Sequence, residues 1–155
     1  KDQPQTEIES ESLPAMEALK HLKLKGLQRT VAVRVNGELC DLSSAIVSQA
    51  ELEPIYLDSE EGLKILRHST SHVMAMAVQD LFPGVKVTIG PAIKDGFYYD
   101  FDYERPFKED DLPKIEEKMN EIIAADLPFV RKEMSSQEAI DFFKKEFNLK
   151  MGEEQ

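Results

Sequence analysis

Two of the three histidines in the chain, His68 and His72, are the residues whose type and spacing could most clearly do chemistry. They lie four positions apart in a stretch that predicts a helix, so both rings project from one helix face, one turn apart. Imidazole titrates near neutral pH, and it is also the commonest side-chain ligand for metals. The pair could therefore position water and move a proton, or it could supply two ligands to a metal ion.

Three interpretations of this pair stay open from the residues alone. The first is structural, with two core histidines whose ring nitrogens bond backbone carbonyls. The second is zinc, which suits His-x-x-x-His on a helix, but Ser69 stands where the metalloprotease motif has glutamate. A zinc site also needs a third ligand, and Cys40 lies in a different part of the chain. The third is acid–base or water-positioning chemistry.

A long helix must carry both histidines. Asp58 and Glu61 form a variant of the capping box, which predicts a helix over residues 60–82 that a Pro-Gly pair stops. On a helical wheel the histidines share their face with small residues, and the helix is apolar almost all round. We therefore expect a buried helix whose second face is the wall of a polar cavity.

Alternating residues predict a hairpin after this helix. Residues 85–89 alternate, and every second residue from Phe97 to Tyr103 is aromatic and falls on one strand face. Such aromatic residues usually form core, although the hydroxyl of Tyr98 or Tyr99 could face a ligand. A charged amphipathic helix is then predicted over 112–126, and a strand over 129–134.

The last predicted helix opens with a second capping box, made by Ser135 and Glu138, and ends near Phe147. The predicted sheet has so few strands that its edges would be exposed. We therefore expect the C-terminal half of this domain to lie outside the chain.

The first 57 residues predict a small α+β module. Residues 6–10 could form a weak strand, and residues 13–25 predict a short helix that Ser12 caps and Gly26 ends. Alternating valines before Asn-Gly predict a tight hairpin with residues 39–42. Residues 52–57 predict an edge strand, because the proline among them cannot donate to a ladder.

Composition excludes several classes of protein. The chain has 155 residues and a formal net charge of −11, whereas duplex nucleic-acid binding requires a basic surface. A single cysteine cannot form an internal disulfide, and Cys40 is most simply inert. The sequence contains no apolar run long enough to cross a bilayer and opens with no secretory signal, so we expect a soluble, cytoplasmic protein.

One basic cluster interrupts the acidic composition. A solvated helix face explains it, although a weak RNA contact stays open. Its members are Lys20, Lys23, Lys25, Arg29 and Arg34.

Three motifs after residue 60 carry a family resemblance. RHS-x-x-H, IGP and DGFYYDFD follow one another in the order and spacing found at the start of the editing domain of bacterial-type threonyl-tRNA synthetases, which this segment resembles. The earlier VRVNGELCDLSSAI resembles the TGS module, a β-grasp fold that precedes the editing domain. The resemblance implies an α+β fold in two parts: a TGS-like module over 1–57, clipped at its N-terminus, and the first part of the editing domain over 58–155.

The same resemblance implies a function. The family's editing site hydrolyses mischarged seryl-tRNA(Thr), because one missing methyl is worth only about 1–3 kcal/mol of discrimination during aminoacylation. By position, His68 and His72 would orient and help activate water against the aminoacyl ester. Tyr99 matches a substrate-binding position, and Gly96 would let the backbone approach the substrate. No metal is implied at this site.

The resemblance also implies partners. They are the aminoacylated 3′ end of tRNA(Thr) and a second copy, with the homodimer formed by domains absent here; no membrane is involved. No cofactor is implied for this segment, because ATP, magnesium and zinc serve the missing catalytic domain. The Cys-x-x-x-His element that completes the family's pocket is absent from the sequence. We therefore expect at most weak editing by the chain alone.

Two other assignments compete with this one. A TGS module followed by a histidine domain also resembles the front of certain nucleoside kinases, where it would be a regulatory or binding module. Freestanding editing proteins of the alanyl type hold zinc, but they usually carry HTATH and lack a TGS module. HSTSH after a TGS-like module favours the threonyl family.

Overall fold

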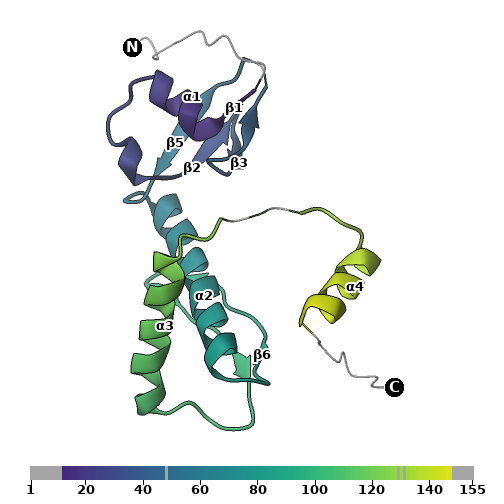
Figure 1. The fold of residues 1–155 in the computed structure, drawn as a ribbon. Helices are drawn as coiled ribbons and strands as arrows, with labels where there is room; N and C mark the ends of the chain where they lie inside the picture. Colours follow the sequence, from purple (N-terminus) through teal and green to yellow (C-terminus); the bar gives the residue numbers. More distant parts are fainter. Residues whose placement is uncertain (1–11, 48, 129, 131, 148–155) are drawn as a thin grey trace. The chain divides into compact units, whose positions relative to one another are not determined.

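A computed structural model describes residues 12–47, 49–128, 130 and 132–147, and the chain forms two compact units, Lys1–Ala125 and Asp126–Gln155 (Figure 1). The described residues mix helices with short antiparallel strands, in agreement with the expected α+β class. None of the described helices is long and apolar enough to span a membrane. The weak strand predicted over 6–10 lies outside the described residues.

The first hairpin is confirmed. β2 (Thr30–Val35) pairs with β3 (Glu38–Cys40), and β5 (Leu52–Tyr56) pairs with the other side of β2. Asn36 and Gly37 both have positive φ, at 52° and 86°, which a two-residue turn between twisted strands requires. β5 is an edge strand of this three-stranded sheet, as predicted. An edge strand tolerates Pro54, because its outer side has no neighbouring strand that would need a backbone N–H.

The first helix is shorter than predicted. α1 (Ala15–His21) begins after Pro14, which holds the N-cap position expected for Ser12, and the helix ends before Gly26. Leu13–Pro14 is instead a strand, β1, that pairs with β4 (Ala45–Ile46). The prediction failed because residue 13 finds a backbone partner far along the chain, and because Lys23 takes a positive φ of 52° that breaks the helix.

α1 and the sheet enclose a small core. Its fully buried members are Ala15, Leu19 and Val33, and the half-buried Cys40 packs against them. Contact with this core gives Cys40 a packing role. The 3₁₀ helix η1 (Leu27–Arg29) connects α1 to the sheet.

The long helix α2 (Glu60–Leu81) starts at the predicted residue with a different cap. Ser59, not Asp58, is the N-cap: its Oγ accepts from the Gly62 N–H at 3.0 Å and donates to the Tyr56 carbonyl at 2.7 Å. Asp58 instead pairs with Arg29. A Cβ on Gly62 would lie 2.0 Å from the Tyr56 carbonyl oxygen, so only glycine lets the helix start this close to β5.

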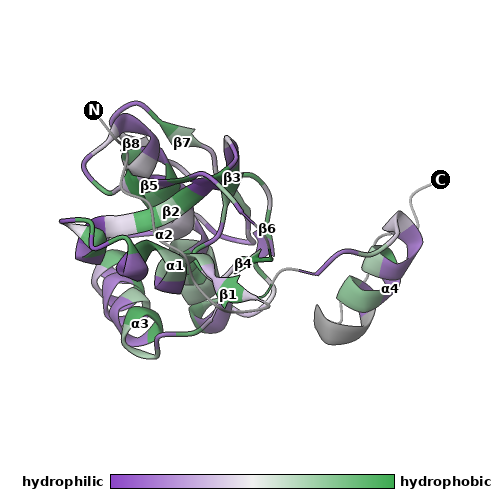
Figure 2. Cartoon of the chain, turned by 90° about the horizontal axis from the view of Figure 1, so that it is seen from above, coloured by the Kyte–Doolittle hydropathy of each residue, from purple (hydrophilic) through white to green (hydrophobic). Residues whose placement is uncertain are grey.

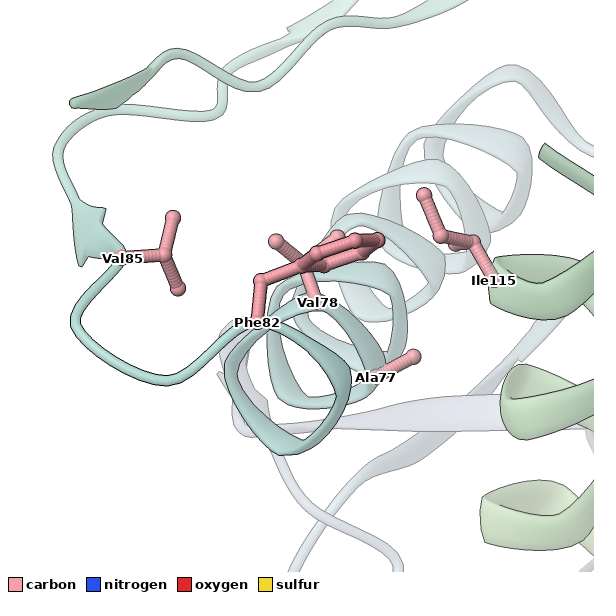
Figure 3. Packing of buried hydrophobic residues seen from close by; sticks show 5 residues of the cluster. All are labelled: Ala77, Val78, Phe82, Val85 and Ile115. Atoms are coloured by element: carbon pink, nitrogen blue, oxygen red, sulfur yellow. The ribbon is translucent and has the colours of Figure 1, made fainter. Parts of the chain in front are cut away.

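A second core lies where α2 meets α3 (Leu112–Ala124), which ends two residues before the predicted end and runs beside α2 (Figure 1). Aromatic residues that follow α2 pack against it, among them Phe101, Tyr103 and Phe107. The buried members are Ala77, Val78, Phe82, Val85 and Ile115 (Figure 3). α3 carries hydrophobic and hydrophilic residues on different sides, as predicted (Figure 2).

The aromatic segment is not one strand. β8 (Gly96–Phe97) pairs with β7 (Ala92–Ile93), whereas β9 (Phe101–Asp102) pairs with β6 (Lys86–Val87). Residues 98–100 between them belong to neither ladder, and Asp100 bonds the backbone of Thr88 and Ile89 there. The alternation correctly predicted core packing for Phe101 and Tyr103, but Phe97 and Tyr99 are not among the residues packed on that core. It also could not show that the two halves have different partners.

A buried carboxylate ties the start of α3 to the aromatic core. Asp111, in the 3₁₀ helix η2 (Glu109–Asp111), accepts from Arg105 Nη1 at 2.7 Å and from the Lys108 N–H at 2.9 Å. The Arg105 guanidinium lies over the Phe82 ring. The bond from Arg105, followed by the Lys108 N–H, lowers the pKa of Asp111 to about 2.

We expect Asp111→Asn to lower the free energy of unfolding at pH 7, because it removes the charge that Arg105 pairs. The folded pKa is below the unfolded value of about 3.9, so the stabilisation is present above pH ~4 and is lost as pH falls toward 2. Urea unfolding measured from pH 7 to pH 2 should show that the difference in unfolding free energy between the variant and the parent shrinks as the pH falls. The exposed Asp110→Asn is the control, and a gap that stays constant with pH would contradict this role of Asp111.

The second unit holds one described helix, α4 (Ser136–Phe147). Its capping box is confirmed: Ser135 N–H and Oγ donate to Glu138 Oε2 at 2.8 and 2.7 Å. The strand predicted over 129–134 is wrong for the described residues of that range, which form no ladder. A hollow of about 790 Å³ lies within this unit, between residues 130 and 132–134 on one side and Ala139, Phe142 and Phe143 of α4 on the other.

Candidate functional site

The structure brings the two histidine rings into direct contact. His72 Nε2 lies 3.2 Å from His68 Nε2, and the ring centroids are 4.6 Å apart at an interplanar angle of 85°. Both come from consecutive turns of one α2 face, as the spacing predicted. Because a hydrogen bond between two ring nitrogens needs one N–H and one lone pair, at most one of the two Nε2 atoms carries the proton of this bond.

The surroundings of the pair differ from the expectation. His68 and His72 are both exposed, so the interpretation as two core histidines is wrong, and so is the expectation of a helix buried almost all round. α2 contacts α3, the first sheet and the short strands β6, β7 and β8, yet neither histidine is among its buried residues. The buried residues of α2 are Gly62, Ser71, Ala75, Ala77 and Val78.

The charge state of His72 follows from its surroundings. The pKa of His72 is lowered, first by partial burial, which disfavours the charged ring, and second by the like charge of His68. Near neutral pH His72 is therefore neutral, with a lone pair available to accept a proton. A neutral imidazole beside a second imidazole can remove a proton from bound water and keep that water oriented.

Tyr99 is the aromatic residue that the structure places beside this pair. Its ring centroid lies 6.5 Å from that of His72, at 72°, and it stacks on Phe101 at 5.1 Å. Tyr98, the other candidate from the sequence, has 49% of its surface exposed. Tyr99 is therefore the tyrosine that the fold holds at the histidines.

Gly90 was missed by the sequence reasoning. A Cβ built on it would lie 2.0 Å from Cδ2 of Tyr99 and 2.3 Å from Cε2, so the ring occupies the space where any other residue has a side chain. The IGP motif contained this glycine, but only the tertiary fold shows which side chain requires it.

Ser71 was also missed. It is fully buried between the two histidines in sequence, with its Oγ 2.7 Å from the His68 carbonyl and 3.2 Å from the Gly90 carbonyl. A usable signal was the run of small residues Ser71, Ala75 and Val78 at helical spacing, which marks a closely packed helix face.

Gly96 lies in β8, where it pairs with Ile93. A Cβ on Gly96 would meet nothing within 4 Å, so there is open space beside it. Among the described contacts, none joins Gly96 to either histidine.

The described residues contain no group of three histidine, cysteine, aspartate or glutamate side chains that could hold a metal ion. Cys40 packs against the core of Ala15, Leu19 and Val33. Three of the five members of the basic cluster make ion pairs: Lys20 with Glu17, Arg29 with Asp58, and Arg34 with Glu53 and Glu61. These pairs favour the interpretation of the cluster as a solvated surface.

Comparison with known proteins places most of this chain beside one enzyme family. No protein-family model matches the chain. It is 54% identical over 120 residues to a threonine–tRNA ligase of Nitratidesulfovibrio vulgaris, 57% over 120 residues to that of Oleidesulfovibrio alaskensis, and 54% over 124 residues to that of Hahella chejuensis. The matches cover 77–80% of this chain and 19% of each relative, so the chain spans about a fifth of their length. The resemblance predicted from the motifs is confirmed.

Proposed function

We propose, from the similarity of 77% of this chain to threonine–tRNA ligases, that it is the N-terminal part of such a ligase. In this proposal residues 1–57 are the TGS-like module and residues 58–155 the first part of the editing domain. The two hydrophobic clusters support the division, because one lies within residues 15–52 and the other within residues 74–122. Ser59 and Gly62 make a tight junction between the parts.

The observation that carries the editing function is the exposed histidine pair. Hydrolysis of a seryl ester requires a positioned water and a group that accepts its proton near neutral pH. A neutral ring of the pair would take that proton as the water oxygen attacks the ester carbon. The proton would then pass to the departing ribose oxygen, releasing serine and tRNA(Thr). An exposed pair suits a substrate as large as tRNA better than a closed cavity would.

Tyr99 and Gly96 complete the proposed site. The Tyr99 ring borders His72 and would contact the aminoacylated 3′ end, and the open space beside Gly96 would let the substrate pass close to the backbone. We assign no cofactor to this step. ATP, magnesium and zinc would serve the aminoacylation part of a complete ligase, which is also where we place the homodimer contacts.

The direct test is release of serine from seryl-tRNA(Thr). The complete gene product that carries these residues should release serine faster than threonine from the matching threonyl-tRNA. The 155-residue chain should be at most weakly active, because its sequence holds no Cys-x-x-x-His element. A complete protein that binds seryl-tRNA(Thr) but leaves the ester intact would refute the editing proposal, and a robust rate from the chain alone would refute the need for the missing element.

We expect the deacylation rate to fall at low pH with an apparent pKa below the ordinary histidine value of about 6.5. The pKa of His72 is lowered, so its neutral form persists further into the acid range before protonation removes the lone pair. Single-turnover rates from pH 5 to pH 8 measure this limb, which reports on the coupled pair and not on one ring. An acid-side fall in rate with an apparent pKa above 6.5 would contradict a neutral His72 as proton acceptor.

A further inference from the structure

We propose that Ser71 is a positioning residue of the histidine site: its buried hydroxyl connects the helical turn that carries both histidines to Gly90, and thereby holds Tyr99 against His72. This inference rests on the proposed editing function for its consequence in catalysis. The connection itself is a property of the fold and can be tested without any substrate.

The first step of the argument is the position of the hydroxyl. Ser71 is 0% exposed, and its Oγ reaches one carbonyl in its own helix and one 19 residues away. The bond to His68 is a local helix contact that many serines make. The contact with Gly90 is different, because it crosses from α2 to the segment before β7. The hydroxyl carries a single hydrogen, which the two carbonyls share, at 2.7 Å for His68 and 3.2 Å for Gly90.

The second step is what Gly90 holds. Gly90 has no side chain, and the Tyr99 ring occupies the space beside its Cα. A Cβ at this position would lie closer to the ring than van der Waals contact allows. The position of Gly90 therefore sets how far the ring can approach α2. On the other side the ring stacks on Phe101, which packs against the second core.

The third step leads from Tyr99 to the reacting groups. The ring borders His72, and partial burial is the main reason that the pKa of His72 is lowered. The described hydrogen bonds of Ser71 go to carbonyl oxygens and not to the rings, so we route its effect on them through Gly90 and Tyr99. A shift of the Gly90 segment would loosen the ring, expose His72 further and widen the range of water positions beside the pair.

The test compares three variants with the parent. S71A removes the hydroxyl, S71C keeps a group of similar shape that is a much weaker donor, and T70A removes the neighbouring hydroxyl, which bonds only the Leu66 carbonyl within α2. Thermal unfolding establishes that each variant is folded. NMR of the chain measures the nuclear Overhauser effects between the Tyr99 and His72 rings, and steady-state deacylation by the complete gene product measures kcat and KM.

We expect S71A and S71C to weaken the Tyr99–His72 effects and to lower kcat about five- to tenfold, which is the loss expected for one hydrogen bond, with KM changed less. T70A should match the parent in both measurements. If S71C keeps the parental kcat and ring contacts, the role of Ser71 is packing and not hydrogen bonding, and the proposal is overturned. Unchanged ring contacts in S71A would overturn it equally.

These outcomes are separate from those of the proposed function. A parent protein that releases no serine refutes editing, whereas the ring contacts in S71A still decide whether Ser71 positions Tyr99. Conversely, an active parent with unaffected S71A leaves editing supported and removes Ser71 from the site.

Discussion

Replacing His72 with alanine is expected to lower the single-turnover rate of seryl-tRNA(Thr) deacylation by about 10²–10⁴-fold, the usual contribution of a positioned acid–base group. His72 is the ring beside Tyr99, and its lowered pKa keeps it neutral near pH 7, so we assign it as the proton acceptor. H68A should cost a similar factor, because it removes the partner that orients His72 through the 3.2 Å contact.

The double variant H68A/H72A should be little slower than either single variant. If the two residues act as a unit, the first substitution already removes their joint contribution to the rate. His21, the remaining histidine, provides the matched control: it is exposed at the end of α1, and H21A should leave the rate unchanged. Multiplying losses in the double variant would show that the two rings act independently. A parental rate in H72A would remove the pair from the mechanism.

Replacing Gly90 with alanine is the second change with a large expected effect. The new Cβ would lie 2.0 Å from Cδ2 of Tyr99, so the ring or the backbone must move. Overpacking of this kind costs about 1–3 kcal/mol of folding free energy. A displacement of about 1 Å near reacting groups can cost about 10²-fold in rate, and we expect a loss of that order.

Gly96→Ala is the matched control for the cost in stability, because its Cβ would meet nothing within 4 Å. Urea unfolding should show a free-energy change within about 0.5 kcal/mol for G96A and a clear loss for G90A. Deacylation adds a second comparison: if Gly96 borders the substrate, G96A raises KM while leaving the fold intact. A G90A variant with parental stability would show that Tyr99 can leave its place freely.

The local elements followed closely from the sequence. Asn36-Gly37, the four-residue spacing of the histidines and the capping box at Ser135 each depend on neighbours a few residues away, and all three are confirmed. The family resemblance also came from short motifs, and the comparisons confirm it. The same local logic failed at Leu13, whose backbone partner is Ile46.

Tertiary structure alone decided which faces are buried. Periodicity showed that α2 had small and apolar residues on two sides, but not that one side would be left open to place His68 and His72 in solvent. It also could not show that Tyr99 fills the space beside Gly90, because that contact depends on how two short ladders meet.

The sequence by itself therefore determined the local features: a helix with two histidines on one face, the Asn36-Gly37 turn and a run of aromatic residues. The tertiary structure decided the exposure of the histidines, the approach of Tyr99 and the buried contact of Ser71 with Gly90. The physical reason is range. Helix and turn preferences act over about four residues, whereas burial and side-chain packing depend on segments that meet only after the chain has folded.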